Sequence, residues 1–277
     1  MILVAGGDSF TYGSELADGV TPFDPNGTED ATPIVSMSTF PALLAKDFNM
    51  QYECTAYPGF SNSAIRRSVM NACEKLPDVG LVFVTWTFPG RYEFRFNYDT
   101  EERWGHWYNI NPWSTIDDID NIQKEFKSNN ETILQHHANH LARAKRTGTS
   151  DFAKIFYKHV GSSKEQYWET YNSLTEIIML QQYLQLKKIP YIFSMVDEAL
   201  LNNCTYLIND ENIATLYNQI DFDRWATFPN NQGFFTWARD YKYPFGTTHP
   251  LEPAHIDAAK YIKENYNELV KEFIQQN

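Results

Sequence analysis

Short apolar runs, each followed by an amphipathic helical pattern, constrain the fold of this chain more than any other feature. Leu81 to Val84 reads Leu-Val-Phe-Val with no polar residue, which is typical of a strand buried on both faces of a parallel sheet. Residues 2–5, 51–56 and 190–195 predict further strands, the second from a weaker pattern. Because both faces of such a sheet must be covered, we expect helices on both sides.

Helical patterns separate these strands. One begins at residues 38–41, where capping hydroxyls precede a proline in the first turn, and another follows Ser61. A long helix is predicted from about Ser163 to Lys188, and a terminal helix from Pro253 onwards. With right-handed crossovers, this alternation predicts an α/β fold: a flavodoxin-like three-layer α/β/α sandwich with four or five parallel strands.

The alternation stops between about residues 92 and 161. Aromatic residues open this segment, and polar helical patterns follow at 117–127 and 131–146. We therefore expect a single domain over residues 1–277, with an aromatic-rich helical insertion at about 92–161. The aromatic rings either contact a sugar or acyl group or form the insertion's own small core; they are Tyr92, Phe94, Phe96, Tyr98, Trp104, Trp107, Tyr108 and Trp113.

Composition excludes several classes of protein. A chain of 277 residues with 43% hydrophobic residues and a formal charge of -12 is globular, and we expect neither nucleic acid nor an anionic membrane as its partner. After Met1 there is no basic segment and no apolar run of signal-peptide or transmembrane length, so we expect a cytoplasmic protein. Three cysteines without metal-ligand spacing predict free thiols.

Metal and nucleotide motifs are also absent from the sequence. His136 and His140 would share a helix face, but position 137 lacks the glutamate of a His-Glu-x-x-His zinc motif, and no third ligand is nearby. Gly6-Gly7 opens neither a G-x-G-x-x-G loop nor a phosphate-binding loop with lysine. We expect no metal and no cofactor.

Polar loops follow the predicted strands. In open parallel sheets, ligands bind beyond the carboxyl ends of the strands, so the loops there should converge. These loops are residues 7–13, 57–62 and 85–91, and residues 248–250 precede the last helix.

The residues of these loops resemble the SGNH (GDSL) hydrolase family. Gly7-Asp8-Ser9 matches the family's first block, residues 38–45 and 56–62 match further blocks, and His249-Pro250 lies where the family's histidine precedes the final helix. Trp86-Thr87 followed by residues 91–94 looks like a variant block of GDSL-like proteins from phage genomes. The order of the blocks makes the resemblance more specific than any one of them.

The resemblance implies a role for each matching residue. Ser9 would be the nucleophile and His249 its base, because a serine hydroxyl needs an imidazole within hydrogen-bond reach. The backbone N–H groups of Ser9 and Gly59 would stabilise an oxyanion. The implied activity is a serine esterase or acylhydrolase acting on a small ester, with an O-acetylated carbohydrate as the candidate substrate.

Two positions depart from the family pattern. Thr87 stands in the third block where the family has Gly-x-Asn-Asp, so its hydroxyl is the candidate third oxyanion donor. Gly246 stands where the family has the acid that orients the histidine. We expect His249 instead to donate to a backbone carbonyl of residues 245–247 or to the Thr247 hydroxyl, with Asp240 and Glu252 as alternative carboxylates.

The remaining candidates have a supporting or substrate-binding role. Asp8 and Asn62 are expected to support the site, and Asp8 and Ser9 could instead be ordinary turn residues. Trp86 and Arg91 are candidate substrate contacts, although Arg91 could simply pair with Glu93 or with the insertion's aspartates.

The incomplete triad leaves a second function open. The alternative to an esterase is an SGNH-fold protein that binds a glycan or protein partner without hydrolysing it. His255, just inside the last helix, is expected to be a surface or interface histidine.

Overall fold

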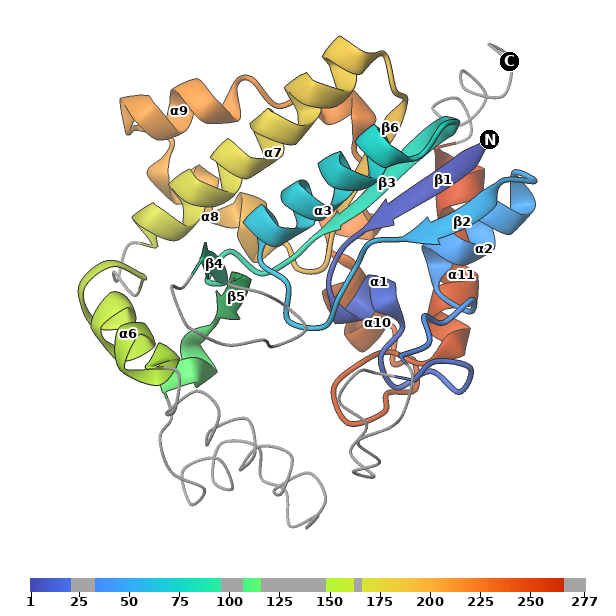
Figure 1. Cartoon of the computed structure of the whole chain (residues 1–277), viewed down its shortest axis with the longest axis horizontal. Helices are drawn as coiled ribbons and strands as arrows, with labels where there is room; N and C mark the ends of the chain where they lie inside the picture. The colour runs from blue at the N-terminus through green and yellow to red at the C-terminus, as the bar shows by residue number, and fades with distance from the viewer. Residues whose placement is uncertain (21–32, 96–106, 116–147, 162–165, 267–277) are drawn as a thin grey trace.

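Parallel strands alternate with helices along most of the chain, as the computed structural model shows (Figure 1). The structure describes residues 1–20, 33–95, 107–115, 148–161 and 166–266. The strands are β1 (Ile2–Gly6), β2 (Gln51–Cys54), β3 (Val79–Trp86), β4 (Tyr92–Arg95), β5 (Trp107–Ile110) and β6 (Tyr191–Met195). The helices are α1 (Ser9–Tyr12), α2 (Phe40–Asp47), α3 (Asn62–Lys75), α6 (Thr149–Phe156), α7 (Tyr167–Lys187), α8 (Ala199–Leu207), α9 (Glu211–Tyr217), α10 (Phe234–Asp240) and α11 (Glu252–Asn265).

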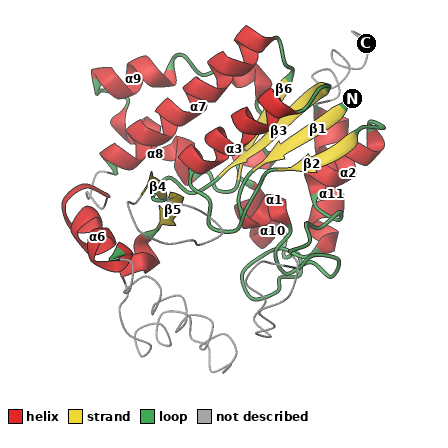
Figure 2. Ribbon diagram, in the orientation of Figure 1, coloured by secondary structure: helices red, strands yellow, loops and turns green. Residues whose placement is uncertain are grey.

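Among the described residues, the central sheet has four parallel strands in the order β2-β1-β3-β6. Leu3 of β1 aligns with Tyr52 on one side and with Leu81 on the other. All strands therefore end at the same edge, and the predicted α/β fold with a parallel sheet between helices is confirmed (Figure 2). The single-domain assignment over residues 1–277 stays a prediction.

Successive residues of β1 point to opposite faces of the sheet, as strand geometry requires. Leu3 and Ala5 lie in a core with α2, α10 and α11, while Val4 lies in a second core with α3 and α7. This double burial explains the uninterrupted apolar run in β3. None of the helices in the described ranges is long and apolar enough to cross a membrane.

The described part of the 92–161 segment contains a β-hairpin that the sequence analysis missed. β4 and β5 pair antiparallel, apart from the central sheet, whereas the sequence analysis expected helical segments here and no strand. Tyr92 and Phe94 alternate with polar residues, as do Tyr108 and Ile110, and these apolar side chains pack against α6. The residues at 117–127 and 131–146, and the histidines of 136–140, lie outside the described residues.

The side chains of the hairpin's other face join it to the main body. Glu93 of β4 accepts two hydrogen bonds from Arg67 of α3, at 2.8 and 2.5 Å, and the guanidinium of Arg67 lies over the ring of Trp107.

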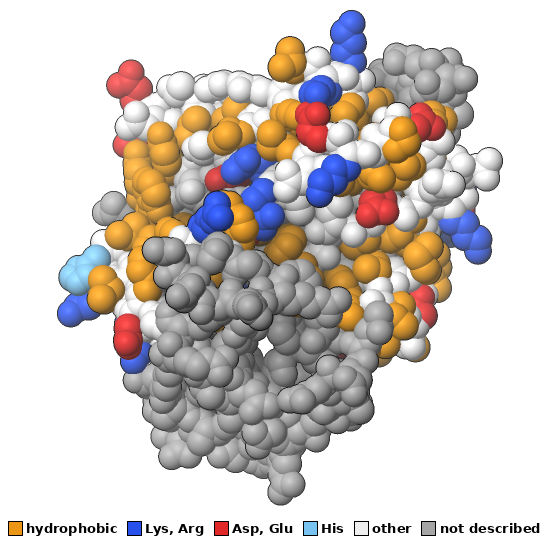
Figure 3. All heavy atoms as spheres, in the orientation of Figure 1, with side chains coloured by type: hydrophobic (Ala, Val, Ile, Leu, Met, Phe, Trp, Pro, Cys, Tyr) orange, Lys and Arg blue, Asp and Glu red, His pale blue; other side chains and the backbone are white. Residues whose placement is uncertain are grey.

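On the face drawn in Figure 3, apolar, basic and acidic side chains are interspersed among the described residues.

His255 links α11 to α2 and is buried, so the expectation of a surface position was wrong. Its Nδ1 accepts the backbone N–H of Phe40 at the first residue of α2, 3.2 Å away, and its ring stacks on the Phe40 ring. Burial, together with the nearby His249, lowers the pKa of the imidazole to about 3. The interior thus holds His255 neutral, as an acceptor for a helix-terminal N–H that has no partner within its own helix.

We predict that His255→Phe changes the acid sensitivity of folding. The imidazole is neutral in the folded protein, and its contribution to the free energy of unfolding is complete above about pH 6.5. Below that pH the unfolded chain takes up a proton that the folded imidazole does not, so the contribution falls by about 1.4 kcal/mol per pH unit. At pH 7.5, leaving the Phe40 N–H unpaired should cost roughly 1–3 kcal/mol in urea unfolding. At pH 5 that difference should shrink by about 2 kcal/mol; an equal difference at both pH values would contradict the assignment.

Candidate active site

The candidate site lies at the carboxyl ends of β1 and β3, where the motif-bearing loops meet. Asp8 caps α1 by accepting the N–H of Phe10 at 3.1 Å, and Ser9 is the first residue of that short helix. This strand-to-helix turn places the Ser9 side chain at the sheet edge, with 8% of the residue exposed. The nucleophile candidate is therefore held by a capped turn of the backbone.

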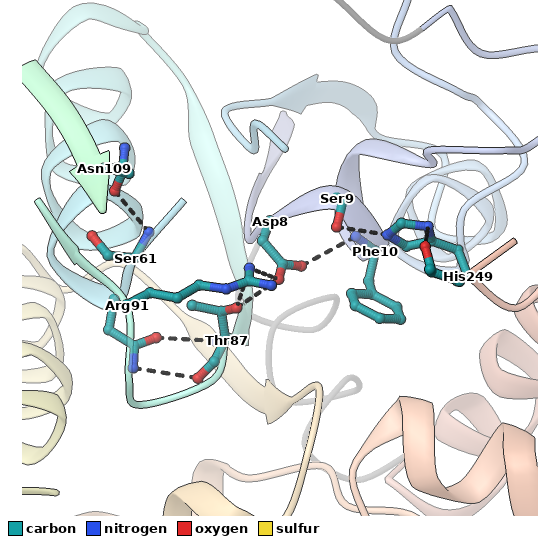
Figure 4. Close-up of polar contacts among 10 residues, drawn as sticks. Asp8, Ser9, Phe10, Ser61, Thr87, Arg91, Asn109 and His249 are labelled. Atoms are coloured by element: carbon teal, nitrogen blue, oxygen red, sulfur yellow. Dashed lines mark hydrogen bonds and ion pairs between the residues drawn. The ribbon is translucent and has the colours of Figure 1, made fainter. Parts of the chain in front are cut away.

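Ser9 and His249 are in direct contact, as Figure 4 shows. The Ser9 Oγ lies 2.8 Å from His249 Nε2, although the two residues are 240 positions apart. The Phe10 ring packs against the imidazole with a centroid separation of 4.7 Å. When Nε2 of the neutral ring accepts a hydrogen bond from the Ser9 hydroxyl, the ring carries its proton on Nδ1.

Thr248 and Glu15 face the other nitrogen of His249. Nδ1 lies 2.9 Å from Thr248 Oγ1 and 3.3 Å from Glu15 Oε1. We expected Nδ1 to face a backbone carbonyl or the Thr247 hydroxyl, and this expectation was wrong. The hydroxyl belongs to Thr248, and it contacts the carboxylate of Glu15.

The two carboxylates considered as alternatives are engaged elsewhere. Glu252 accepts the backbone N–H of Ala17 at 2.8 Å. Asp240 accepts from Gln232 at 2.6 Å and from Arg239. Because neither contact involves His249, the carboxylate of the site is the one that the sequence analysis did not consider.

The Glu15 carboxylate holds the whole turn that carries His249. It accepts the backbone N–H groups of Thr248 and His249 at 3.1 and 3.2 Å, and the Thr248 hydroxyl donates to it at 3.1 Å. Partial burial raises the pKa of Glu15, but the contact with His249 and these N–H donors outweigh it and lower the pKa to about 2. Glu15 therefore stays ionised at neutral pH.

A buried ion pair lies directly behind Ser9. Asp8 is fully buried, and its Oδ2 accepts from the Arg91 guanidinium at 2.7 Å and from the Thr87 hydroxyl at 2.5 Å (Figure 4). The Thr87 hydroxyl in turn accepts from Arg91 at 2.9 Å. A hydroxyl has one proton to donate. Since Thr87 gives it to Asp8, the expectation that Thr87 donates to an oxyanion is wrong in this arrangement.

Neither predicted substrate contact is available as expected. Trp86 is completely buried in the core under α3 and α7, edge-on to Phe193. Arg91 is 9% exposed and pairs with Asp8, which the sequence analysis did not consider, whereas the candidate partner Glu93 pairs with Arg67. Both residues support the loop instead of facing a ligand.

Asn62 fixes the loop after β3. Its Oδ1 accepts the Thr87 N–H at 3.0 Å, and its Nδ2 donates to the Ser173 hydroxyl at 3.1 Å and to the Thr87 carbonyl at 3.4 Å. Asn109 of β5 accepts the N–H of Ser61 at 3.0 Å, so the hairpin contacts the loop after β2, at the residue before Asn62 (Figure 4).

Gly59 lies in the loop after β2, where its φ of 84° places it in the left-handed region. Glycine adopts this conformation without the strain that a side chain would add. The motif residue is thus required by the shape of the turn.

Metal binding has no structural support in the part of the chain that the structure describes. No group of three or more His, Cys, Asp or Glu side chains there could hold a metal ion. Cys54, Cys73 and Cys204 are all free thiols, as expected.

Glu15 and Thr248 are the site residues that sequence reasoning missed. Neither belongs to a motif block, although Thr248 adjoins His249 and Glu15 lies six positions after Ser9. The available signal was a carboxylate close behind the nucleophile in a chain whose motif acid is replaced by Gly246.

We predict that Arg91→Met strongly destabilises the fold. The substitution leaves the Asp8 carboxylate buried without its cation, which should cost roughly 3–5 kcal/mol in urea unfolding. The double variant Asp8→Asn/Arg91→Met, which removes both charges, should recover part of that loss. If the free energy of unfolding of Arg91→Met lies within about 1 kcal/mol of the wild-type value, the pair is not buried as described.

Comparisons with known proteins place esterases among the similar structures. No family model matches the chain, and no curated protein matches it. An acetyl xylan esterase from the rumen bacterium Butyrivibrio proteoclasticus is 14% identical, with a TM-score of 0.41 over 96% of this chain; this chain spans 64% of that protein's length.

Two further structures are similar over nearly their whole length. A psychrotrophic esterase from a Pseudoalteromonas species is 8% identical with a TM-score of 0.43, and 98% of each chain is covered. A lipolytic protein of the G-D-S-L family from Veillonella parvula is 11% identical with a TM-score of 0.40, over 96% of this chain and 98% of that one. The last carries the name of the family that the sequence motifs resemble.

Proposed function

We propose that this chain is a serine ester hydrolase of the SGNH type, with Ser9 as nucleophile and His249 as general base. The observation that carries the proposal is the 2.8 Å contact between Ser9 Oγ and His249 Nε2. That distance lies within the range over which a base can take a hydroxyl proton. A capped turn and an anchored histidine hold the two groups together before any substrate binds.

The proposed reaction has two halves. Ser9 Oγ attacks the ester carbonyl carbon while its proton passes to His249 Nε2, and the carbonyl oxygen becomes an oxyanion. The intermediate collapses, the C–O bond to the alcohol breaks, and the imidazolium returns the proton to the leaving oxygen. Water then attacks the acyl group on Ser9 through the same base, which releases the acid and restores the serine.

Stabilisation of the oxyanion rests on backbone donors in this proposal. Ser9 is the first residue of α1, where N–H groups have no acceptor within the helix, and Gly59 is the second candidate. Because Thr87 is bound to Asp8, we expect two donors instead of three. The loss of one donor typically costs about 3 kcal/mol of transition-state stabilisation.

We further propose a small ester, such as an O-acetylated carbohydrate, as the substrate. Half-buried Phe88 and Phe235 pack on Phe10, which itself packs against His249. These rings are tilted at 59° to 76° to one another and form an apolar cluster beside the reacting groups. Tyr92, Phe94 and Tyr108 of the hairpin do not support the proposal, because they form a small core with α6. Trp107 is exposed and lies under the guanidinium of Arg67.

A second candidate is a protein that binds a glycan or protein partner at this site without hydrolysing it. The observation that favours it is the Thr87 hydroxyl, which donates to Asp8 and leaves the oxyanion without that side-chain donor. The Ser9–His249 contact favours the enzyme. Turnover distinguishes the two candidates, because only the enzyme cleaves an ester.

We predict that wild-type protein hydrolyses p-nitrophenyl acetate with a burst and that Ser9→Ala and His249→Ala do not. Removal of the nucleophile or base of a serine hydrolase lowers kcat by roughly 10³-fold or more. Cys54→Ser is a matched control, because a hydrolysis rate carried by a thiol would fall in that variant alone. Equal background rates for wild type and Ser9→Ala would remove the esterase proposal and favour the binding protein.

A further inference from the structure

Glu15 occupies the position in space that a triad acid needs, although it comes from the opposite end of the chain from the family's acid. We propose that Glu15 is the positioning residue that completes a Ser9–His249–Glu15 triad, and that Gly246 is a glycine because Glu15 occupies the space of its missing side chain. The inference rests on the proposed function, because it assigns the third member of that same site.

The first support is the set of contacts on the imidazole. The Nδ1–H of His249 faces Thr248 Oγ1 at 2.9 Å and Glu15 Oε1 at 3.3 Å, and the Thr248 hydroxyl donates to the same carboxylate oxygen at 3.1 Å. The carboxylate therefore acts on the ring directly and through one hydroxyl. Either route fixes the tautomer in which Nε2 is free to accept the Ser9 proton.

The second support is steric. A Cβ built at Gly246 would lie 2.2 Å from Glu15 Oε2, far inside contact distance. Any side chain at 246 would displace the Glu15 carboxylate, so an aspartate there and Glu15 in its present place exclude each other. The absence of the motif acid and the presence of Glu15 are two consequences of one arrangement.

The third support is the backbone of Glu15. Its φ of 71° lies in the left-handed region, which residues other than glycine seldom adopt. Such conformations cost of order 1 kcal/mol and persist where the surroundings hold them. Here, the backbone N–H groups of Thr248 and His249 bind the carboxylate that this backbone presents.

The charge of Glu15 suits the role that we assign. A negative charge beside Nδ1 stabilises the imidazolium that forms when Ser9 attacks, while the carboxylate itself stays unprotonated. The other ionisable groups near the turn have partners or are buried: Glu252 binds the Ala17 N–H, Asp8 pairs with Arg91, and His255 is buried and neutral. Asp18 accepts from the hydroxyls of Ser36 and Ser38 and from the Met37 N–H.

We predict that Glu15→Gln and Glu15→Ala lower kcat/KM for p-nitrophenyl acetate by about 10²- to 10⁴-fold, as loss of a triad acid does elsewhere. In Glu15→Gln the acid limb of the pH–rate profile should move to lower pH, because the imidazolium loses its counter-charge. Glu252→Gln, which changes a neighbouring carboxylate outside the site, should alter neither quantity.

Transfer of the acid tests the steric claim. Gly246→Asp or Gly246→Ala alone should lower activity by displacing Glu15, whereas Glu15→Ala/Gly246→Asp should regain at least about tenfold over Glu15→Ala. If Gly246→Ala keeps wild-type activity, or if Glu15→Gln leaves both rate and acid limb unchanged, the triad assignment is wrong.

An NMR titration separates this inference from the proposed function. The His249 imidazole resonances, assigned by comparison with His249→Gln, should titrate at lower pH in Glu15→Gln than in wild type, with or without hydrolysis. If Ser9→Ala matches wild type in activity while this shift is present, the esterase proposal fails and the Glu15 contact stands. An unchanged titration in an active enzyme overturns the role of Glu15 alone.

Discussion

The candidate site depends on the Glu15 carboxylate, which joins a loop near the start of the sequence to the loop that carries His249. Ser9 lies on the first turn after β1, while His249 lies on a loop just before α11, 240 residues later. Glu15 comes from the nucleophile's own loop and binds two consecutive backbone N–H groups of the histidine's loop. The carboxylate that faces the imidazole thus also fixes the separation between His249 and Ser9, the proposed base and nucleophile.

A second charged contact, between Asp8 and Arg91, holds the turn that carries Ser9, the proposed nucleophile. Asp8 caps α1 with one carboxylate oxygen and pairs with Arg91 through the other, so that it links β1 to the loop after β3. A buried carboxylate is strongly unfavourable without such a partner. Thr87 is part of this network, and its hydroxyl has a structural role at the position where the SGNH pattern has an oxyanion-donating asparagine.

Both departures from the SGNH motif therefore have a structural counterpart. Gly246 leaves room for Glu15, and Thr87 serves Asp8 and Arg91 instead of an oxyanion. Under the proposed function, the triad is complete with an acid from a new position, while the oxyanion site relies on the backbone. These two differences act in opposite directions on the expected rate.

The strand and helix alternation made the sheet predictable, because double burial leaves an unmistakable apolar run such as Leu81 to Val84. Ser9 and His249 were candidates for a different reason: Gly7-Asp8-Ser9 and His249-Pro250 resemble blocks of the SGNH pattern. Glu15 was not, because its role depends on a contact between distant loops that no local pattern encodes. The β4–β5 hairpin was readable in the alternation around Tyr92 and Phe94, but the density of aromatic residues obscured it.

The most direct test of the account is whether Ser9 becomes covalently modified through His249. Intact-mass and peptide mass spectrometry after treatment with an alkyl fluorophosphonate should show one phosphonyl group, located on Ser9, in wild-type protein. His249→Ala should react far more slowly, and Ser9→Ala should not react at that peptide. Modification of another residue, or equal labelling of Ser9 with and without His249, would contradict the claim that these two residues form a nucleophile and its base.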